Sequence, residues 1–132
     1  MPIKSLEAYL ARVEEKLKEL EPIISSSQIS IERRSPNRII LAGKITFIDG
    51  SRLHFLEYVL ELNNRLLRVS YRFHYTKREG GLIFRYDNAP HHPELPKFPY
   101  HKHIPGEKVL PSDEMNLIDV LDEIKEIVTN EL

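Results

Sequence analysis

Alternating apolar and polar residues run from residue 28 to residue 88, and this alternation constrains the fold more than any other feature of the chain. A period of two predicts β-strands, and turn residues divide the run into five of them. Asp49-Gly50 and Asn63-Asn64 suit two-residue hairpin turns, because Gly and Asn tolerate a positive φ. The expected strands are residues 29–34, 38–48, 53–62, 66–76 and 82–87. Short loops between successive strands predict an antiparallel meander.

Apolar residues recur at helical spacing on both sides of this run. Ser5 is a suitable cap for a helix that Pro22 ends, and Pro111-Ser112 is expected to open a second helix. We therefore expect one α+β domain over residues 1–132. It consists of a five-stranded antiparallel meander sheet, N- and C-terminal helices packed on one face, and a Pro/His-rich loop before the last helix.

The hairpin turns also decide which side chains share a face of the sheet. A two-residue turn at Asp49-Gly50 places Lys44 opposite Phe55, and the second turn places Glu57 opposite Ser70. The expected core face consists of Ile39, Leu41, Ile45, Phe47, Leu56, Tyr58, Leu60, Leu67, Val69, Tyr71, Phe73, Tyr75, Leu82, Phe84 and Tyr86. The expected polar face consists of Lys44, Thr46, Glu57, Arg68, Ser70, Arg72, His74, Arg85 and Asp87.

Composition excludes several classes of protein. The absence of Cys removes disulfides, thiolate catalysis and zinc–cysteine sites. No apolar run is long enough to span a bilayer, and no signal-peptide pattern is present, so a cytoplasmic location is expected. The formal net charge of −1 hides an asymmetry: the termini are acidic, while residues 33–103 carry most of the Arg and all of the His. Such a basic centre can bind phosphate.

Arginine, histidine and aspartate on the last two expected strands form the first candidate site. Residues two apart on a strand share a face, so Arg72 projects with His74, and Arg85 with Asp87. Two guanidiniums can hold a phosphate, and an imidazole can exchange a proton near neutral pH. The same residues also suit a solvated sheet face with cross-strand ion pairs.

The segment from Phe84 to His103 holds four of the six histidines, and its prolines at 90, 93, 96 and 99 predict an extended loop. These histidines can bind phosphate or exchange protons, fasten the loop to the sheet, or bind zinc or manganese together with Asp87. Phosphate and proton chemistry is the preferred interpretation, and no metal or other cofactor is expected. The four histidines are His91, His92, His101 and His103.

Other residues of the basic centre are candidates for binding. Phe98 and Tyr100 can stack on nucleic-acid bases, and Glu57 can orient a base or pair with Arg72. The candidate binding residues are Lys44, Glu57, Arg68, Tyr86, Asn88, Phe98, Tyr100 and Lys102.

Several motifs together resemble the TumE-like toxins of toxin–antitoxin modules. They are Gly43–Ser51 (GKITFIDGS), Tyr71–Tyr75 (YRFHY), Phe84–His92 (FRYDNAPHH), Phe98–His103 (FPYHKH) and Leu117–Ile124 (LIDVLDEI). The resemblance covers roughly residues 40–125, and FRYDNAPHH and FPYHKH are its most specific motifs. It implies a small growth-inhibiting toxin encoded beside a helix-turn-helix antitoxin that neutralises it.

Residues and resemblance together predict a toxin that acts on RNA as a metal-independent endoribonuclease. His74, or a loop histidine such as His91 or His101, would remove the 2′-hydroxyl proton, and a second histidine would protonate the leaving oxygen. Arg72 and Arg85 would stabilise the phosphate. The alternatives are a non-catalytic module that binds RNA or antitoxin, and a metal-dependent nuclease that uses the aspartate and loop histidines. The expected partners are a helix-turn-helix antitoxin and RNA, and a homodimer is a further assembly that the sequence allows.

Overall fold

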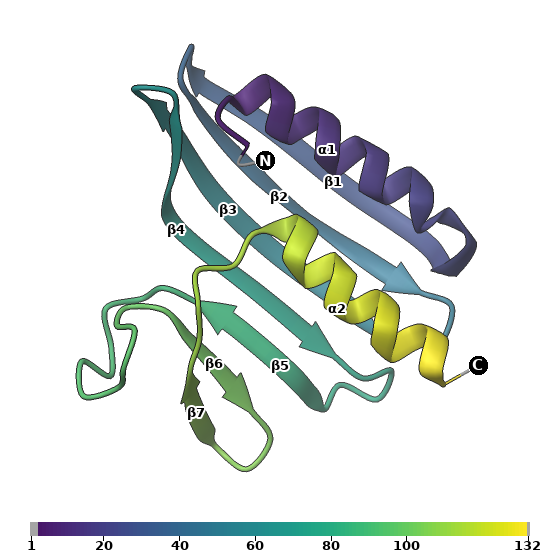
Figure 1. Ribbon diagram of the computed structural model, residues 1–132. Helices are drawn as coiled ribbons and strands as arrows, with labels where there is room; N and C mark the ends of the chain where they lie inside the picture. Colours follow the sequence, from purple (N-terminus) through teal and green to yellow (C-terminus); the bar gives the residue numbers. More distant parts are fainter. Residues whose placement is uncertain (1–2, 132) are drawn as a thin grey trace.

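A computed structural model describes residues 3–131 as a twisted antiparallel sheet with two helices on one face (Figure 1). The helices are α1 (Leu6–Glu19) and α2 (Leu117–Asn130), and the short 3-10 helix η1 (Glu21–Ile23) follows α1. The strands are β1 (Ile24–Ser35), β2 (Arg38–Phe47), β3 (Arg52–Leu62), β4 (Arg65–Thr76), β5 (Leu82–Asp87), β6 (His101–Ile104) and β7 (Lys108–Pro111), and their order in the sheet is their order in the chain. We call the side covered by α1 and α2 the helix face, and the other side the open face.

The α+β class and the antiparallel meander are confirmed, but the sheet has seven strands instead of the five predicted. β6 and β7 are four-residue strands within the part of the chain that we expected to be an extended loop. The prolines at 90, 93, 96 and 99 lie in the segment between β5 and β6. Pro105 lies in the β6–β7 turn, and Pro111 ends the edge strand β7, where a missing N–H is tolerated. Two short strands therefore fit a proline-rich sequence.

Both helices begin at side-chain caps. The Ser5 hydroxyl accepts a hydrogen bond from the first turn of α1, as predicted. Asn116 and Asp119 form a capping box, so α2 begins at Leu117 and not at Pro111-Ser112 as predicted. Within residues 3–131, no helix has the length and apolar character that crossing a membrane requires.

The β2–β3 hairpin has a three-residue loop, which makes the predicted two-residue turn wrong. Gly50 has a φ of +86°, and the Phe47 N–H donates to the Ser51 carbonyl over 2.9 Å. The extra loop residue shifts β3 by one position, so that Lys44 lies opposite His54 and not opposite Phe55. The faces predicted for β3 are therefore reversed. Leu53, Phe55, Glu57 and Val59 lie on the helix face, and Leu56, Tyr58 and Leu60 lie on the open face.

A β-bulge changes the register of β4. The Asn63-Asn64 turn is confirmed, with φ angles of 51° and 59°. Beyond it, Val69 has no opposite residue on β3, and the pairing shifts by one. Arg68 lies before this bulge, opposite Val59, so it follows the reversed β3 onto the helix face and not onto the polar face as predicted. The shift at Val69 then returns Tyr71 to the helix face and Arg72 to the open face, as predicted. Leu67 and Val69, which were predicted to be core residues, are 38% and 54% exposed.

The β4–β5 pairing confirms the predicted faces of the first candidate site. Arg72 lies opposite Asp87, and His74 lies opposite Arg85. A second irregularity in the pairing, near the start of β5, leaves Leu82 beside Arg85 on the open face. Leu82 is therefore not the core residue that was predicted.

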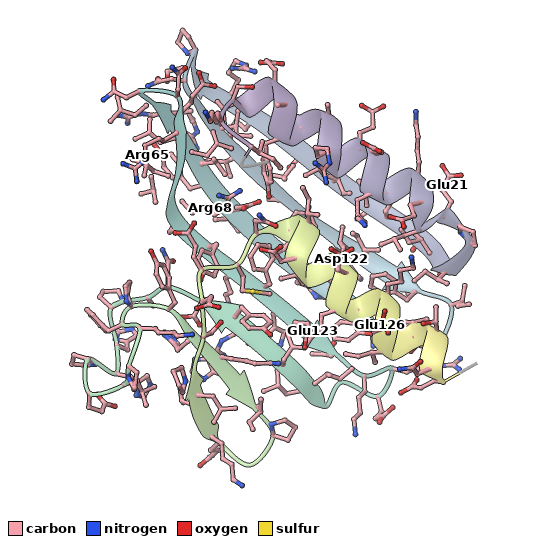
Figure 2. All side chains as sticks on the ribbon, viewed as in Figure 1. Glu21, Arg65, Arg68, Asp122, Glu123 and Glu126 are labelled. Carbon is pink, nitrogen blue, oxygen red and sulfur yellow. The ribbon has the colours of Figure 1, made fainter. Side chains whose placement is uncertain are left out.

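A buried ion pair joins the helices to the sheet. Glu57 has no exposed surface; one of its oxygens accepts from Arg68 Nε over 2.7 Å, and the other accepts from the Tyr9 hydroxyl over 2.5 Å. The Tyr9 oxygen in turn accepts from the Leu117 N–H at the start of α2, over 3.2 Å. Figure 2 shows Arg68 reaching from β4 toward this end of α2. Burial raises the pKa of both Glu57 and Tyr9, and Arg68 opposes this effect. The network links α1, β3, β4 and α2.

Candidate active site on the open face of the sheet

Two rows of directly opposed residues bring the candidate reactive groups together on the open face. We call these six residues, which come from β4, β5 and β6, the open-face cluster. One row is Arg72, Asp87 and His101, and the other is His74, Arg85 and His103. The formation of β6 is therefore what carries two histidines of the proline-rich segment onto the sheet beside the arginines.

Asp87 and His101 form a buried, fully bonded pair within the cluster. They are 7% and 2% exposed, and His101 Nε2 lies 2.5 Å from Asp87 Oδ1. His101 Nδ1 donates to the Pro99 carbonyl over 2.9 Å. Because both ring nitrogens are engaged, His101 has none free for a substrate. It fixes β6 against β5 and orients Asp87, so we treat it as a positioning residue.

Arg85 is the centre of the cluster. Its Nε donates to Asp87 Oδ2 over 3.1 Å, and its Nη2 lies 3.0 Å from His103 Nε2. A guanidinium can only donate, so His103 Nε2 accepts and the proton of this ring lies on Nδ1. Burial lowers the pKa of His103, and Arg85 adds to this effect. The 3.5 Å approach of the same Nε2 to Asp87 Oδ2 is then a close contact without a hydrogen bond.

His74 is the histidine on the other side of Arg85. Burial lowers the pKa of His74, and the charges of Arg72 and Arg85 lower it further. Its Nδ1 is buried and has no hydrogen-bond partner in the part of the chain that the structure describes. At neutral pH His74 is therefore mainly the neutral imidazole, and no side chain or backbone group of residues 3–131 fixes its tautomer. His54 lies directly opposite it on β3. The sequence did not indicate this residue, because a two-residue turn in the β2–β3 hairpin would place it on the other face of the sheet.

The loop before β6 adds one histidine and leaves another outside. The His92 ring lies 5.7 Å from the His101 ring and 6.2 Å from the His103 ring, centroid to centroid. Its Nδ1 is 3.2 Å from Glu94 Oε1, which leaves Nε2 free. Glu94 was not predicted, and no spacing in the sequence indicated it. His91 is exposed, and its ring takes part in none of these contacts among residues 3–131.

The predicted binding residues outside the cluster are divided between the two faces. Lys44 is exposed on the open face, where it lies opposite His54. Tyr86 and Lys102 lie on the helix face instead, where the hydroxyl and the ammonium donate to Glu123 of α2 over 2.6 and 3.0 Å. These two residues therefore attach α2 to β5 and β6.

The remaining predicted binding residues flank the cluster. Asn88 continues the β4 ladder, since its side-chain oxygen accepts from the Tyr71 N–H over 2.9 Å. The Tyr100 hydroxyl donates to Glu114 over 3.0 Å. Phe98 is 45% exposed, and its ring is open to solvent beside the cluster's loop. Of the two predicted stacking residues, Phe98 is thus the more accessible.

Three members of the cluster also have the spacing of a metal site. Asp87, His101 and His103 each place a possible ligand atom within 4.8 Å of the others. However, Arg85 already donates to both Asp87 and His103, and its charge opposes a second cation at this position. A metal ion would have to displace the guanidinium. The residues therefore fit a cationic, proton-exchanging site better than a metal centre.

Fold and site together define a two-layer α+β protein in which two helices cover one face of a sheet and the other face carries a cluster of His, Arg and Asp. The family model described as toxin TumE matches residues 12–128, which is most of the chain. The chain belongs to the TumE toxin family. Membership indicates the toxin component of a toxin–antitoxin system and implies an antitoxin partner. Comparisons with curated proteins and with solved structures give no match.

Proposed function

We propose that this toxin cleaves RNA, with Arg85 binding the scissile phosphate and His74 and His103 acting as the acid–base pair. The observation that carries the proposal is the order His74–Arg85–His103 across three adjacent strands. Neighbouring strands lie about 4.8 Å apart, so the two histidines are about 10 Å apart with the arginine between them. In-line attack by a 2′-hydroxyl requires a base on one side of the phosphorus and an acid on the other.

The proposed roles follow from the protonation of each ring. His74 is neutral and would accept the proton of the 2′-hydroxyl as that oxygen attacks the phosphorus. Arg85 and Arg72 would stabilise the negative charge that develops on the phosphate oxygens. His103 is neutral in the free protein, with its proton on Nδ1; it would first take up a second proton, on the Nε2 that faces Arg85, and the resulting imidazolium would donate a proton to the 5′-oxygen as the P–O bond breaks. The products would be a 2′,3′-cyclic phosphate and a 5′-hydroxyl.

Substrate binding would adjust the acidity of both histidines. Burial and the neighbouring arginines lower the pKa of His74 and of His103 in the free protein. A phosphodiester seated on Arg85 brings a negative charge that offsets those arginines. Its arrival would therefore make each imidazole easier to protonate, which is what a general acid requires. The bonded pair of Asp87 and His101 would hold Arg85 and β6 in place.

Cleavage is expected to need no metal ion, because Arg85 already provides the positive charge at the phosphate position. Purified full-length protein should cleave single-stranded RNA at a rate that excess chelator changes by no more than about twofold. Gel analysis of a labelled RNA measures this. Activity that disappears in chelator and returns with manganese or zinc would instead favour a metal-dependent nuclease built on Asp87, His101 and His103. RNA binding without cleavage under either condition would favour a non-catalytic module.

The helix-turn-helix character of the antitoxin and the formation of a homodimer remain predictions from the sequence. The resemblance to TumE-like toxins supports the first.

A further inference from the structure

Charge is segregated between the two sides of the molecule. α1 and α2 together carry eight carboxylates and four cationic side chains. Figure 2 shows Asp122, Glu123 and Glu126 along α2. On the open face of β2 to β6, the only carboxylate among the described residues is that of Asp87, which Arg85 and His101 already contact. The open face of β2 to β6 is thus cationic, although the net charge of the chain is only −1.

Five polar side chains form a line across that face, because each lies directly opposite the next on the neighbouring strand. We call it the cross-strand row: Lys44, His54, His74, Arg85 and His103, each directly opposite the next on β2 to β6. Arg52 and Arg72 flank the row on β3 and β4. Lys44, Arg52 and Arg72 form no salt bridge with any other described residue. Four strand spacings give the row a length of about 19 Å.

Two depressions of the surface follow the row. One is lined by His54, Leu56, Arg72 and His74, near its middle. The other is lined by Lys77, Leu82, Arg85, His103 and Lys108, near its end. Both expose apolar carbon beside cationic groups, which is the combination that accommodates nucleotides: a base on the apolar part and a phosphate on the cation.

We propose that the cross-strand row binds the sugar–phosphate backbone of single-stranded RNA and leads it into the open-face cluster. The row extends the proposed function, because its last three residues are the acid–base pair and phosphate ligand assigned above. Its length suits about four nucleotides, the short end of the site sizes of sheet-based single-strand binders. The imidazole of His54 and the side chains of Leu56 and Tyr58 provide flat or apolar surfaces for unstacked bases.

The test uses the far end of the row, which lies away from the proposed chemistry. The probe is a ten-nucleotide single-stranded RNA with 2′-O-methyl groups throughout, which cannot be cleaved by 2′-hydroxyl attack. Its affinity for the full chain is measured by fluorescence anisotropy over a range of salt concentrations. For a single strand, the slope of log K against log salt flattens by about 0.7 for each cationic side chain that no longer neutralises a phosphate. Lys44→Ala combined with Arg52→Ala should therefore flatten the slope by about 1.4 and weaken binding.

The control is Arg12→Ala combined with Lys18→Ala, which removes the same charge from exposed positions of α1, on the opposite side of the molecule from the row. If the row variant and this control change affinity and slope equally, the proposed path is wrong. Tighter binding of a duplex of the same sequence would also overturn it. These outcomes leave the proposed function intact if cleavable RNA is still cut. Conversely, binding along the row with no cleavage of any RNA would contradict the proposed function and retain the path.

Discussion

Replacing Arg68 with alanine should lower the free energy of unfolding by about 3–5 kcal/mol, because the buried carboxylate of Glu57 then loses its counter-charge. Glu57 is wholly buried and its Oε2 lies 2.7 Å from Arg68 Nε, so solvent does not take the place of the guanidinium. A domain of this size has a total stability of about 5–15 kcal/mol, so the loss is a large part of it. Urea unfolding followed by circular dichroism measures the change.

Two further variants show whether the effect comes from the buried charge. Arg12→Ala removes an arginine whose contact with Glu15 is exposed and 3.9 Å long, and it should cost less than about 0.5 kcal/mol. The double variant Glu57→Gln with Arg68→Met removes both charges and should recover part of the loss. If Arg68→Ala costs no more than Arg12→Ala, the ion pair does not hold the helices to the sheet.

The loss caused by Arg68→Ala should depend on pH in a definite direction. Burial raises the pKa of Glu57 in the folded protein above its unfolded value, and removing Arg68 takes away an effect that opposes this. The folded variant therefore binds the Glu57 proton more tightly than the unfolded chain does. The loss of unfolding free energy in the variant is therefore greatest above the folded-state pKa of Glu57. It shrinks as the pH falls toward the pKa of Glu57 in the unfolded chain.

The single variants His74→Ala and His103→Ala should each cleave RNA about 10²–10⁴-fold more slowly than the wild type, because a general acid or base usually contributes that much to the rate. Arg85→Ala should slow it by at least about 10²-fold, because the developing charge on the phosphate loses its main partner. Single-turnover cleavage of a labelled RNA measures the chemical step. Circular dichroism and urea unfolding of the same samples show whether each variant remains folded.

His91→Ala is the matched control for these variants, since it removes a histidine that the structure leaves outside the cluster. It should cleave at nearly the wild-type rate. Equal activity of His74→Ala, His103→Ala and His91→Ala would show that the acid–base pair has been assigned wrongly.

Local sequence patterns predicted most strands of this fold and the pairing of β4 with β5. The alternation of Phe84, Arg85, Tyr86 and Asp87 is unambiguous, so matching apolar residues across the hairpin gave the correct faces. The Asn63-Asn64 turn was equally predictable, because two adjacent residues with positive φ favour a two-residue loop.

The errors arise where one extra residue in a loop or bulge reverses the face of the sheet to which each following side chain points. Asp49-Gly50 fits a two-residue turn and also a three-residue loop with Gly in the left-handed conformation, and the sequence does not distinguish them. The bulge at Val69 likewise has no marker such as Gly or Pro. The loop moved Glu57 and Arg68 from the expected polar face into the core, where charged residues are rare, and they form an ion pair there. The bulge returned the rest of β4 to its predicted faces.

Part of the site depends on long-range pairing that a local pattern does not reveal. β6 has only four residues and lies among prolines, so its sequence favours a loop. It becomes a strand because His101 bonds Asp87 and because Lys102 reaches Glu123 of α2. The sequence thus identified the reactive residue types, whereas their order across the sheet came only from the structure.

The chemical nature of the RNA ends tests the central claim most directly. Mass spectrometry of a short RNA cleaved by the purified protein should find a 2′,3′-cyclic phosphate and a 5′-hydroxyl, because the 2′-oxygen is the proposed nucleophile. The same RNA with a single 2′-deoxynucleotide at the cleavage position should remain intact. Products with a 5′-phosphate, or cleavage of the deoxy-substituted RNA at that position, would contradict the account.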